Sequence, residues 1–188
     1  MTRMAKNDGL HPTPEGVGEL IYEEANPFYR FMRSVAATAP MAWFFARTLH
    51  HVDPPVFRLT DGRHTFVSLV TGLPVIMLTT TGAQSGKSRT LPVLGLPDGE
   101  RMVVVASNYG HSNNPSWYHN LLAHPAAEIF VDGMTRRVVA REVEGEERER
   151  LWRRGLEVYP GWGGYERRAG ARRIPVMVLS PEGYPARE

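Results

Sequence analysis

The sequence predicts a mainly β (α+β) fold, in which consecutive antiparallel strands close into a barrel and a few helices lie outside it. Two observations support this prediction. From residue 56 onward, short apolar segments rich in β-branched residues follow one another, and three of the turns between them contain Asp-Gly, a strong hairpin signal. Helical patterns do not alternate regularly with these segments, as they would in a parallel, doubly wound sheet.

The expected strands follow one another along the second part of the chain. One hairpin should form around Asp61-Gly62 and a later one around Asp132-Gly133. The segment at 102–107 is almost wholly apolar, which is typical of a strand buried on both faces. The expected strands cover residues 56–60, 65–70, 74–81, 89–96, 102–107, 127–131, 135–141 and 174–180.

Three helical regions are expected beside these strands. Residues 21–51 should be helical, with Pro40 separating two helices, and their apolar stripes consist of Phe28, Phe31, Met32, Val35, Trp43, Phe44 and Leu49. A second helix should run over 114–123, with Asn114 as N-cap, and a charged amphipathic one over 145–159. The chain is therefore expected to divide into a flexible tail and helical N-terminal segment at 1–55 and a barrel domain at 56–188.

Composition and patterning narrow the classes of function. The 188 residues include no cysteine, which excludes disulfides, thiolate metal sites and cysteine nucleophiles. The net charge of +2 is too small to indicate a nucleic-acid-binding protein, and the histidines lack the spacing of a helical zinc site, so no metal is expected. The N-terminus carries no signal-peptide pattern, and glycine and proline interrupt the charge-free stretch at 65–86. We therefore expect a cytoplasmic protein with no integral membrane segment.

The loop at 79–89 is the most informative segment. It follows an apolar strand, its two glycines let backbone N–H groups converge on one point, and Lys87 and Arg89 add positive charge. These features predict a phosphate or other anion site; the alternative is an ordinary polar hairpin turn. Gly86-Lys87-Ser88 matches the end of a P-loop, but the first glycine falls one residue late and a strand pattern follows instead of a helix.

A second concentration of positive charge lies towards the C-terminus. It is either a solvated helix face with its flanking loop or an attraction for an anionic ligand. Its members are Arg153, Arg154, Arg167, Arg168, Arg172 and Arg173.

Several ordered blocks make the sequence resemble the deazaflavin-dependent nitroreductase family, also called the F420-dependent oxidoreductases. The first is Thr-Thr-Gly-x-x-Ser-Gly-x-x-Arg at 80–89, and the second is Val-Val-Ala-Ser-Asn-Tyr-Gly at 104–110. Asn-Pro-Ser-Trp-Tyr-His-Asn-Leu at 114–121 and Ala-His-Pro at 123–125 come next. Tyr159-Pro160, Tyr165 and Ile174-Pro175-Val176 complete the match, which spans about residues 74–181.

The resemblance implies a split β-barrel related to FMN-binding barrels, with coenzyme F420 as cofactor and often with a homodimeric assembly. It implies that the coenzyme's phosphate and glutamate tail are held by Gly82, Gln84, Ser85, Gly86, Lys87 and Arg89. It also implies that the deazaflavin ring is bordered by Ser107, Asn108, Tyr109, Gly110, Pro115 and Trp117. Family members often carry two basic residues where this chain has Ala83 and Gln84, so tail binding is expected to depend more on Lys87, Arg89 and the C-terminal arginines.

The expected activity is hydride transfer from the reduced coenzyme to a planar, electron-poor small molecule such as a quinone or a nitroaromatic. Ser107 should stabilise negative charge on the ring, and Tyr159 or Tyr165 should donate a proton to the acceptor. Glycines between Tyr159, Trp162 and Tyr165 predict a mobile turn that forms a wall over the substrate; the alternative is that these rings close the end of the core. An FMN-dependent reductase on the same barrel and a coenzyme-binding protein without turnover are the two alternative functions.

Overall fold

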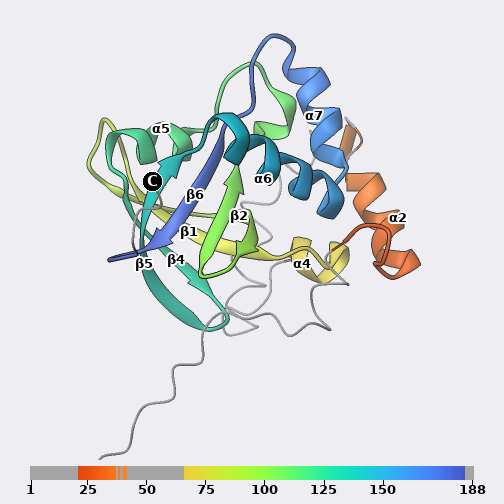
Figure 1. The fold of residues 1–188 in the computed structure, drawn as a ribbon, viewed down its shortest axis with the longest axis horizontal. Coiled ribbons are helices and arrows are strands. Elements are labelled where there is room, and N and C mark those ends of the chain that lie inside the picture. The colour runs from red at the N-terminus through yellow and green to blue at the C-terminus, as the bar shows by residue number, and fades with distance from the viewer. Residues whose placement is uncertain (1–20, 37, 39, 42–65, 185–188) are drawn as a thin grey trace, which may run out of the picture.

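The computed structural model of the chain describes residues 21–36, 38, 40, 41 and 66–184. Six antiparallel strands form a closed barrel in the order β1-β2-β3-β6-β5-β4 (Figure 1). They are β1 (Val75–Thr81), β2 (Ser88–Asp98), β3 (Arg101–Val105), β4 (Ala126–Val131), β5 (Met134–Glu142) and β6 (Val176–Pro181). The mainly β barrel is confirmed, and so are the six strands predicted from residue 74 onward. The Asp132-Gly133 turn is a two-residue hairpin in which both residues have positive φ, as a type I′ turn requires.

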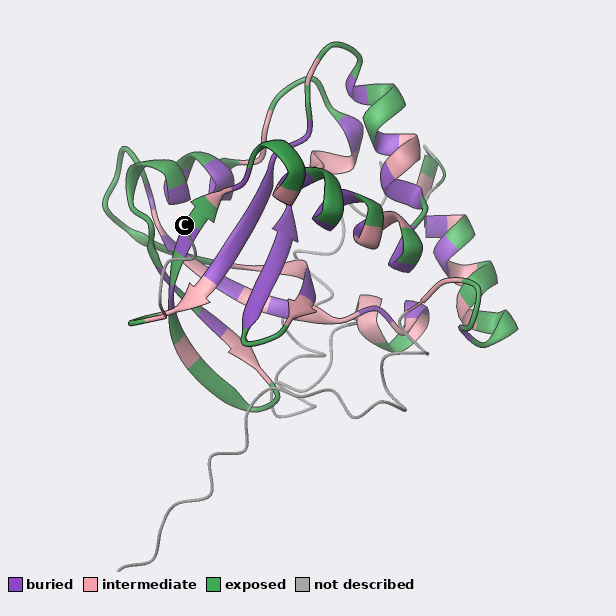
Figure 2. Ribbon diagram, in the orientation of Figure 1, coloured by how far each residue is buried: buried purple, intermediate pink, exposed green. Residues whose placement is uncertain are grey.

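Alternation along the strands produces two hydrophobic clusters, because successive side chains point to opposite faces. Residues from all six strands meet in one cluster that fills the barrel, and Leu121 of a flanking helix joins it. The other faces of β3 and β6 carry Val103 and Val178, which pack against Trp152 and Trp162 outside the barrel. β3 and β6 are thus buried on both sides (Figure 2).

The helices lie outside the barrel. They are α2 (Pro27–Ala36), α4 (Phe66–Thr71), α5 (Ser116–Ala123), α6 (Gly145–Val158) and α7 (Gly161–Ala169), with a short 3-10 helix, η1 (Asn108–Gly110). α5 packs on β1 and β5, α6 on β6, and α2 lies beside α7 at the edge of the molecule (Figure 1). The helices predicted at 114–123 and 145–159 are confirmed. No helix within the described ranges is long and apolar enough to cross a membrane.

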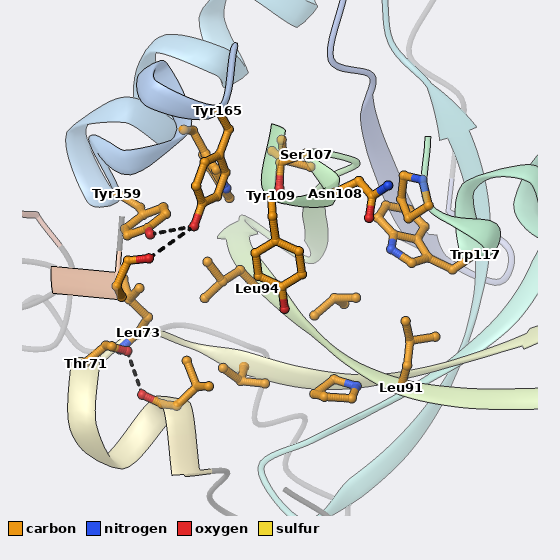
Figure 3. Close-up of a pocket in the computed structure, with 18 residues that line it drawn as sticks. Thr71, Leu73, Leu91, Leu94, Ser107, Asn108, Tyr109, Trp117, Tyr159 and Tyr165 are labelled. Carbon is orange, nitrogen blue, oxygen red and sulfur yellow. Dashed lines mark hydrogen bonds between the residues drawn. The ribbon is translucent and has the colours of Figure 1, made fainter. Parts of the chain in front are cut away.

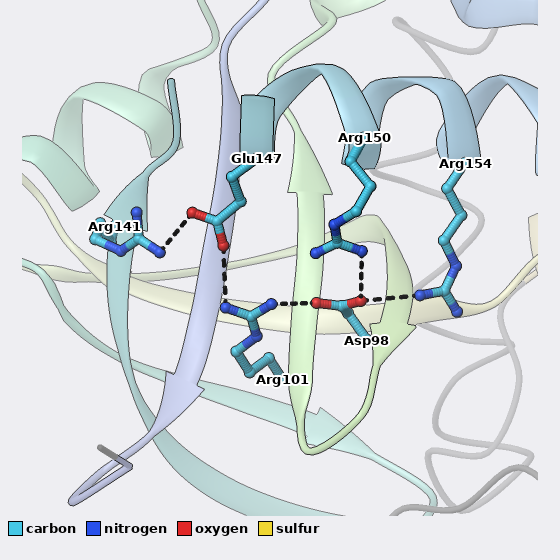
Figure 4. A network of polar contacts seen from close by, with 6 residues as sticks. All are labelled: Asp98, Arg101, Arg141, Glu147, Arg150 and Arg154. Carbon is cyan, nitrogen blue, oxygen red and sulfur yellow. Dashed lines mark hydrogen bonds and ion pairs between the residues drawn. The ribbon is translucent and has the colours of Figure 1, made fainter. Parts of the chain in front are cut away.

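A network of charged side chains ties α6 to the hairpin of β2 and β3 (Figure 4). The Asp98 carboxylate accepts hydrogen bonds from Arg101, from Arg150 at 3.3 Å and from Arg154 at 3.0 Å. Burial alone would raise the pKa of Asp98, but the hydrogen bonds from the arginines outweigh it and the pKa is lowered. Arg154, one of the clustered C-terminal arginines, therefore has a structural partner.

The strand predicted at 65–70 is wrong, because α4 occupies these residues. Their β-branched side chains favour a strand, but local bonds close a helix instead. The Thr71 hydroxyl donates to the Val67 carbonyl at 2.6 Å, and the Gly72 N–H donates to the Ser68 carbonyl at 2.8 Å. Gly72 has φ +63°, the left-handed conformation that commonly ends a helix. The predicted strand at 56–60, its hairpin at Asp61-Gly62, the helix beyond residue 41 and the domain boundary at 55 lie outside the described residues.

The apolar stripe predicted along the first helix is also wrong in part. Phe28 and Phe31 are 58% and 65% exposed, whereas Arg33 is buried. The Arg33 guanidinium donates to the carbonyl oxygens of Thr71 at 2.8 Å and Val158 at 3.3 Å. The carbonyl oxygens at the C-terminal ends of α4 and α6 lack partners within their own helices, and the buried Arg33 of α2 provides the hydrogen-bond donors for them. Trp43, Phe44 and Leu49 lie outside the described residues.

Candidate functional site

A cavity of about 320 Å³ lies between the barrel and the surrounding helices (Figure 3). β1 and β2 form its floor, α4 and the end of α2 border one end, and the segment from Val105 to Trp117 forms the opposite wall. Eight of the predicted site residues line it: Ser107, Asn108, Tyr109, Pro115, Trp117, Tyr159, Trp162 and Tyr165. No acidic side chain of the described residues lines this cavity.

The turn at 107–110 has a strained backbone. Asn108 and Tyr109 both have positive φ, 46° and 56°, which side chains rarely adopt. The Asn108 Nδ2 donates to the Asn113 carbonyl at 2.9 Å. Gly110 has φ +82° and does not line the cavity; a Cβ there would lie 2.8 Å from the Tyr165 carbonyl oxygen, so glycine permits close contact between this turn and α7.

Arg172 stabilises this turn by hydrogen bonds. Its guanidinium donates to the carbonyls of His111 at 2.9 Å, Ala106 at 3.1 Å and Ser107 at 2.8 Å, and to Asn114 Oδ1 at 2.6 Å. Burial lowers the pKa of Arg172. Arg172 was one of the arginines expected to bind the coenzyme's tail, but its guanidinium instead makes these hydrogen bonds within the protein. Asn114 is not an N-cap, because its side chain bonds Arg172 and Pro115 precedes the first residue of α5.

Two tyrosine hydroxyls meet at the other end of the cavity (Figure 3). The Tyr159 and Tyr165 oxygens are 3.0 Å apart, and the Tyr165 hydroxyl donates to the Ala36 carbonyl of α2 at 3.5 Å. Burial raises the pKa of both tyrosines, so both hydroxyls stay protonated at neutral pH. Both hydroxyls are therefore available to donate a hydrogen bond to a bound ligand.

The glycine-rich segment around these tyrosines is a helix, so the prediction of a turn is wrong. Gly161 begins α7, and Trp162 is buried and stacks on Trp152 with ring centroids 6.3 Å apart. A Cβ at Gly161 would lie 2.4 Å from the Tyr159 ring, and one at Gly155 would lie 2.5 Å from the Trp162 ring. These glycines make room for the aromatic rings. The rings line the cavity and belong to the core at the same time.

The anion loop lies next to α5, away from the cavity's lining. Gly82 donates to the Lys87 carbonyl at 2.9 Å and Gly86, at φ +64°, donates to Gly82 at 2.8 Å, so the loop is a tight ring of bonds. Residues 83–89 are exposed, and within the described part of the chain neither Lys87 nor Arg89 is in an ion pair. The loop thus presents two cations to solvent.

Asn120 connects the loop to α5 and was not predicted. Its Nδ2 donates to the Thr80 hydroxyl at 3.0 Å, and its Oδ1 accepts the Ala83 N–H at 3.0 Å. Asn120 lies one helical turn from Trp117, which lines the cavity. A ligand that extends from the cavity past α5 would therefore reach the loop. The available signal was a polar residue among the aromatic and aliphatic residues that form one face of this helix.

The fold and the aromatic-lined cavity define the chain as a split β-barrel protein of the kind that holds flavin-type coenzymes. The family model described as F420H(2)-dependent quinone reductase matches residues 53–181, and the chain belongs to this family. It is 35% identical over 129 residues to an F420H(2)-dependent quinone reductase of Mycobacterium tuberculosis, covering 66% of this chain and 85% of that protein. The predicted family, split barrel, enzyme class and coenzyme are thereby confirmed: the protein is an F420-dependent oxidoreductase.

Two solved structures support the assignment. An F420-H2 dependent reductase, FDR-A, is 37% identical, with a TM-score of 0.53 over 57% of this chain and 94% of that one. A protein described as a domain-swapped dimer is 32% identical, with a TM-score of 0.55 over 76% of this chain and 100% of that one.

The residues present fit F420. The cavity offers Pro115, Trp117 and the β2 side chains to a flat ring, with no acidic residue of the described chain to repel an electron-rich one. Lys87 and Arg89 offer charge to a phosphate and a glutamate tail. Among the described residues, no group of three or more histidine, aspartate and glutamate side chains has the arrangement of a metal site.

Proposed function

We propose that the protein reduces quinones with hydride from reduced F420 in this cavity. The ring would lie by the 107–110 turn, Pro115 and Trp117, and the tail would follow α5 to the loop at 82–89. The observation that carries the proposal is that one cavity joins the strained turn to the tyrosine pair. The Tyr109 and Tyr165 rings are 6.2 Å apart, so a ring held at the turn and an acceptor held at the tyrosines would be neighbours.

Bound reduced F420 supplies the hydride, so the protein's own residues have to orient the two ligands and manage charge. Arg172 fixes the turn that borders the ring, and the Ser107 hydroxyl is available on the cavity wall to stabilise negative charge. Hydride arrival leaves negative charge on the acceptor oxygen, which requires a proton donor.

Tyr165 is the better placed donor. Its hydrogen bond to the Ala36 carbonyl is long, 3.5 Å, and therefore weak. Little free energy is lost when this hydroxyl turns towards an acceptor oxygen. Tyr159 can donate to the Tyr165 oxygen at 3.0 Å and so stabilise the negative charge left after the transfer. We therefore assign Tyr165 as the direct donor and Tyr159 as its supporting partner.

The test is steady-state oxidation of reduced F420 with menadione and with a nitroaromatic, together with equilibrium titrations of F420 and FMN. Turnover with menadione is expected, with F420 bound more tightly than FMN. Coenzyme binding without protein-dependent oxidation by any acceptor would favour a coenzyme-binding protein without turnover.

We also propose that the protein acts in the cytoplasm as a homodimer. The relative described as a domain-swapped dimer supports the assembly. Light scattering after size-exclusion chromatography should give twice the mass of the 21.1 kDa chain; a mass of one chain would contradict the dimer.

A further inference from the structure

Tyr109 occupies a position where glycine would be less strained. It is the second of two consecutive non-glycine residues with positive φ, and the surrounding bonds of Arg172 and Asn108 hold it there. Strain of this kind persists only where the rest of the structure enforces it, and it concentrates at functional sites. An aromatic side chain at this strained position is therefore expected to serve the site.

The Tyr109 ring projects from the turn into the middle of the cavity (Figure 3). Trp117 and Leu91 lie on one side of it, and Tyr165 and Leu73 on the other. The Tyr109 ring meets Tyr165 edge to face, with centroids 6.2 Å apart and planes at 64°. The ring thus narrows this single cavity between a coenzyme lobe, beside Trp117, and an acceptor lobe, beside Tyr165.

We propose that Tyr109 sets the size of the acceptor that this enzyme takes, by narrowing the cavity where the coenzyme lobe meets the acceptor lobe. The inference rests on the proposed function. Hydride transfer requires the donor carbon and the acceptor to approach to about 3–3.5 Å. Both flat ligands must therefore fit around the Tyr109 side chain in a cavity of about 320 Å³, so a larger side chain at this position leaves less room for the acceptor.

The experiment compares the full-length wild type with Tyr109→Gly, Tyr109→Phe and Tyr109→Trp. Glycine adopts positive φ without steric cost, so Tyr109→Gly should fold, and phenylalanine keeps the ring without the hydroxyl. The acceptors are benzoquinone, menadione and phenanthrenequinone, with one, two and three rings. Their affinities are measured by quenching of tryptophan fluorescence, because Trp117 and Trp162 line the cavity. The Michaelis constants with reduced F420 and the dissociation constant of F420 are measured on the same proteins.

Tyr109→Gly should raise the ratio of phenanthrenequinone to benzoquinone, in affinity and in kcat/KM, by about tenfold or more. Tyr109→Trp should shift the ratio the other way, and Tyr109→Phe should leave it unchanged. An unchanged ratio in Tyr109→Gly would overturn the proposal. So would a tenfold loss of F420 affinity with constant acceptor ratios, which would assign the ring to the coenzyme.

The affinity measurements keep the two proposals apart. If no quinone oxidises reduced F420 in the wild type, but the binding ratio still shifts in Tyr109→Gly, the proposed function fails and the role of Tyr109 stands. If menadione is turned over and neither ratio shifts, the proposed function stands and the role of Tyr109 fails.

Discussion

Replacing Arg172 by lysine should damage the turn beside the proposed ring site more than the small chemical change suggests. The guanidinium makes four hydrogen bonds, three to backbone carbonyls and one to the Asn114 side chain. Lysine keeps the charge, but its single nitrogen lacks the planar fork that reaches these acceptors together. At least two of the four bonds should be lost.

The magnitude follows from those bonds. Hydrogen bonds from a charged donor contribute about 1.5–3 kcal/mol each, and Arg172 is only partly buried, so losing two should destabilise the protein by about 2–3 kcal/mol. The same bonds hold Asn108 and Tyr109 at positive φ, a strain of order 1–3 kcal/mol each. If relaxation of the turn makes the free energy of F420 binding less favourable by only 1.4 kcal/mol, the affinity falls about tenfold.

Arg173→Lys is the matched control for Arg172→Lys. Arg173 is the next residue and makes an exposed ion pair with Glu149 at 3.2 Å, which contributes about 0–1 kcal/mol. Urea unfolding and F420 titration on both variants give the comparison. If Arg172→Lys has the same free energy of unfolding and the same F420 affinity as Arg173→Lys, the hydrogen bonds of Arg172 do not organise the site.

The other predictions concern the loop and the proton donor. Asn120→Leu loses both bonds to the loop, so it should cost about 2 kcal/mol of stability and weaken F420 binding with little change in the quinone KM, measured by unfolding and titration. Lys87→Ala and Arg89→Ala should each raise the F420 dissociation constant by about ten- to a hundredfold, less so at high salt; unchanged affinity in both would remove the loop from the site. Tyr165→Phe should keep F420 affinity but lower kcat by about a hundredfold or more, and lose about 1 kcal/mol of stability because Tyr159 loses its partner; an unchanged kcat would exclude Tyr165 as donor.

The strands were predictable because their signals are local. β3 from Met102 and β6 as far as Leu179 are continuous apolar runs, and Asp-Gly turns mark the hairpins at 98–99 and 132–133. α4 was not predictable, since its β-branched sequence favours a strand, whereas contacts around Thr71 and Gly72 stabilise a helix.

The errors at the site have a different cause. The glycines of α7 look like a flexible turn, but Gly161 is required by the approach of the Tyr159 ring, which is invisible until the helices pack. Arg172 was grouped with the other C-terminal arginines as either solvated or ligand-binding, because nothing local indicates that four acceptors converge on it. Asn120 was missed for the same reason: its partners lie 37 and 40 residues away in the sequence. Which of the cavity residues contact F420 stays a prediction.

The most direct test is single-turnover oxidation of reduced F420 by menadione, followed by coenzyme fluorescence with wild type and Tyr165→Phe side by side. The account predicts that the wild type oxidises one coenzyme per menadione reduced, and that Tyr165→Phe binds F420 equally well but reacts far more slowly. Reduced F420 that persists in the presence of wild type and menadione would contradict the assignment of this cavity as a quinone reductase site, and equal rates in the two proteins would exclude Tyr165 as its proton donor.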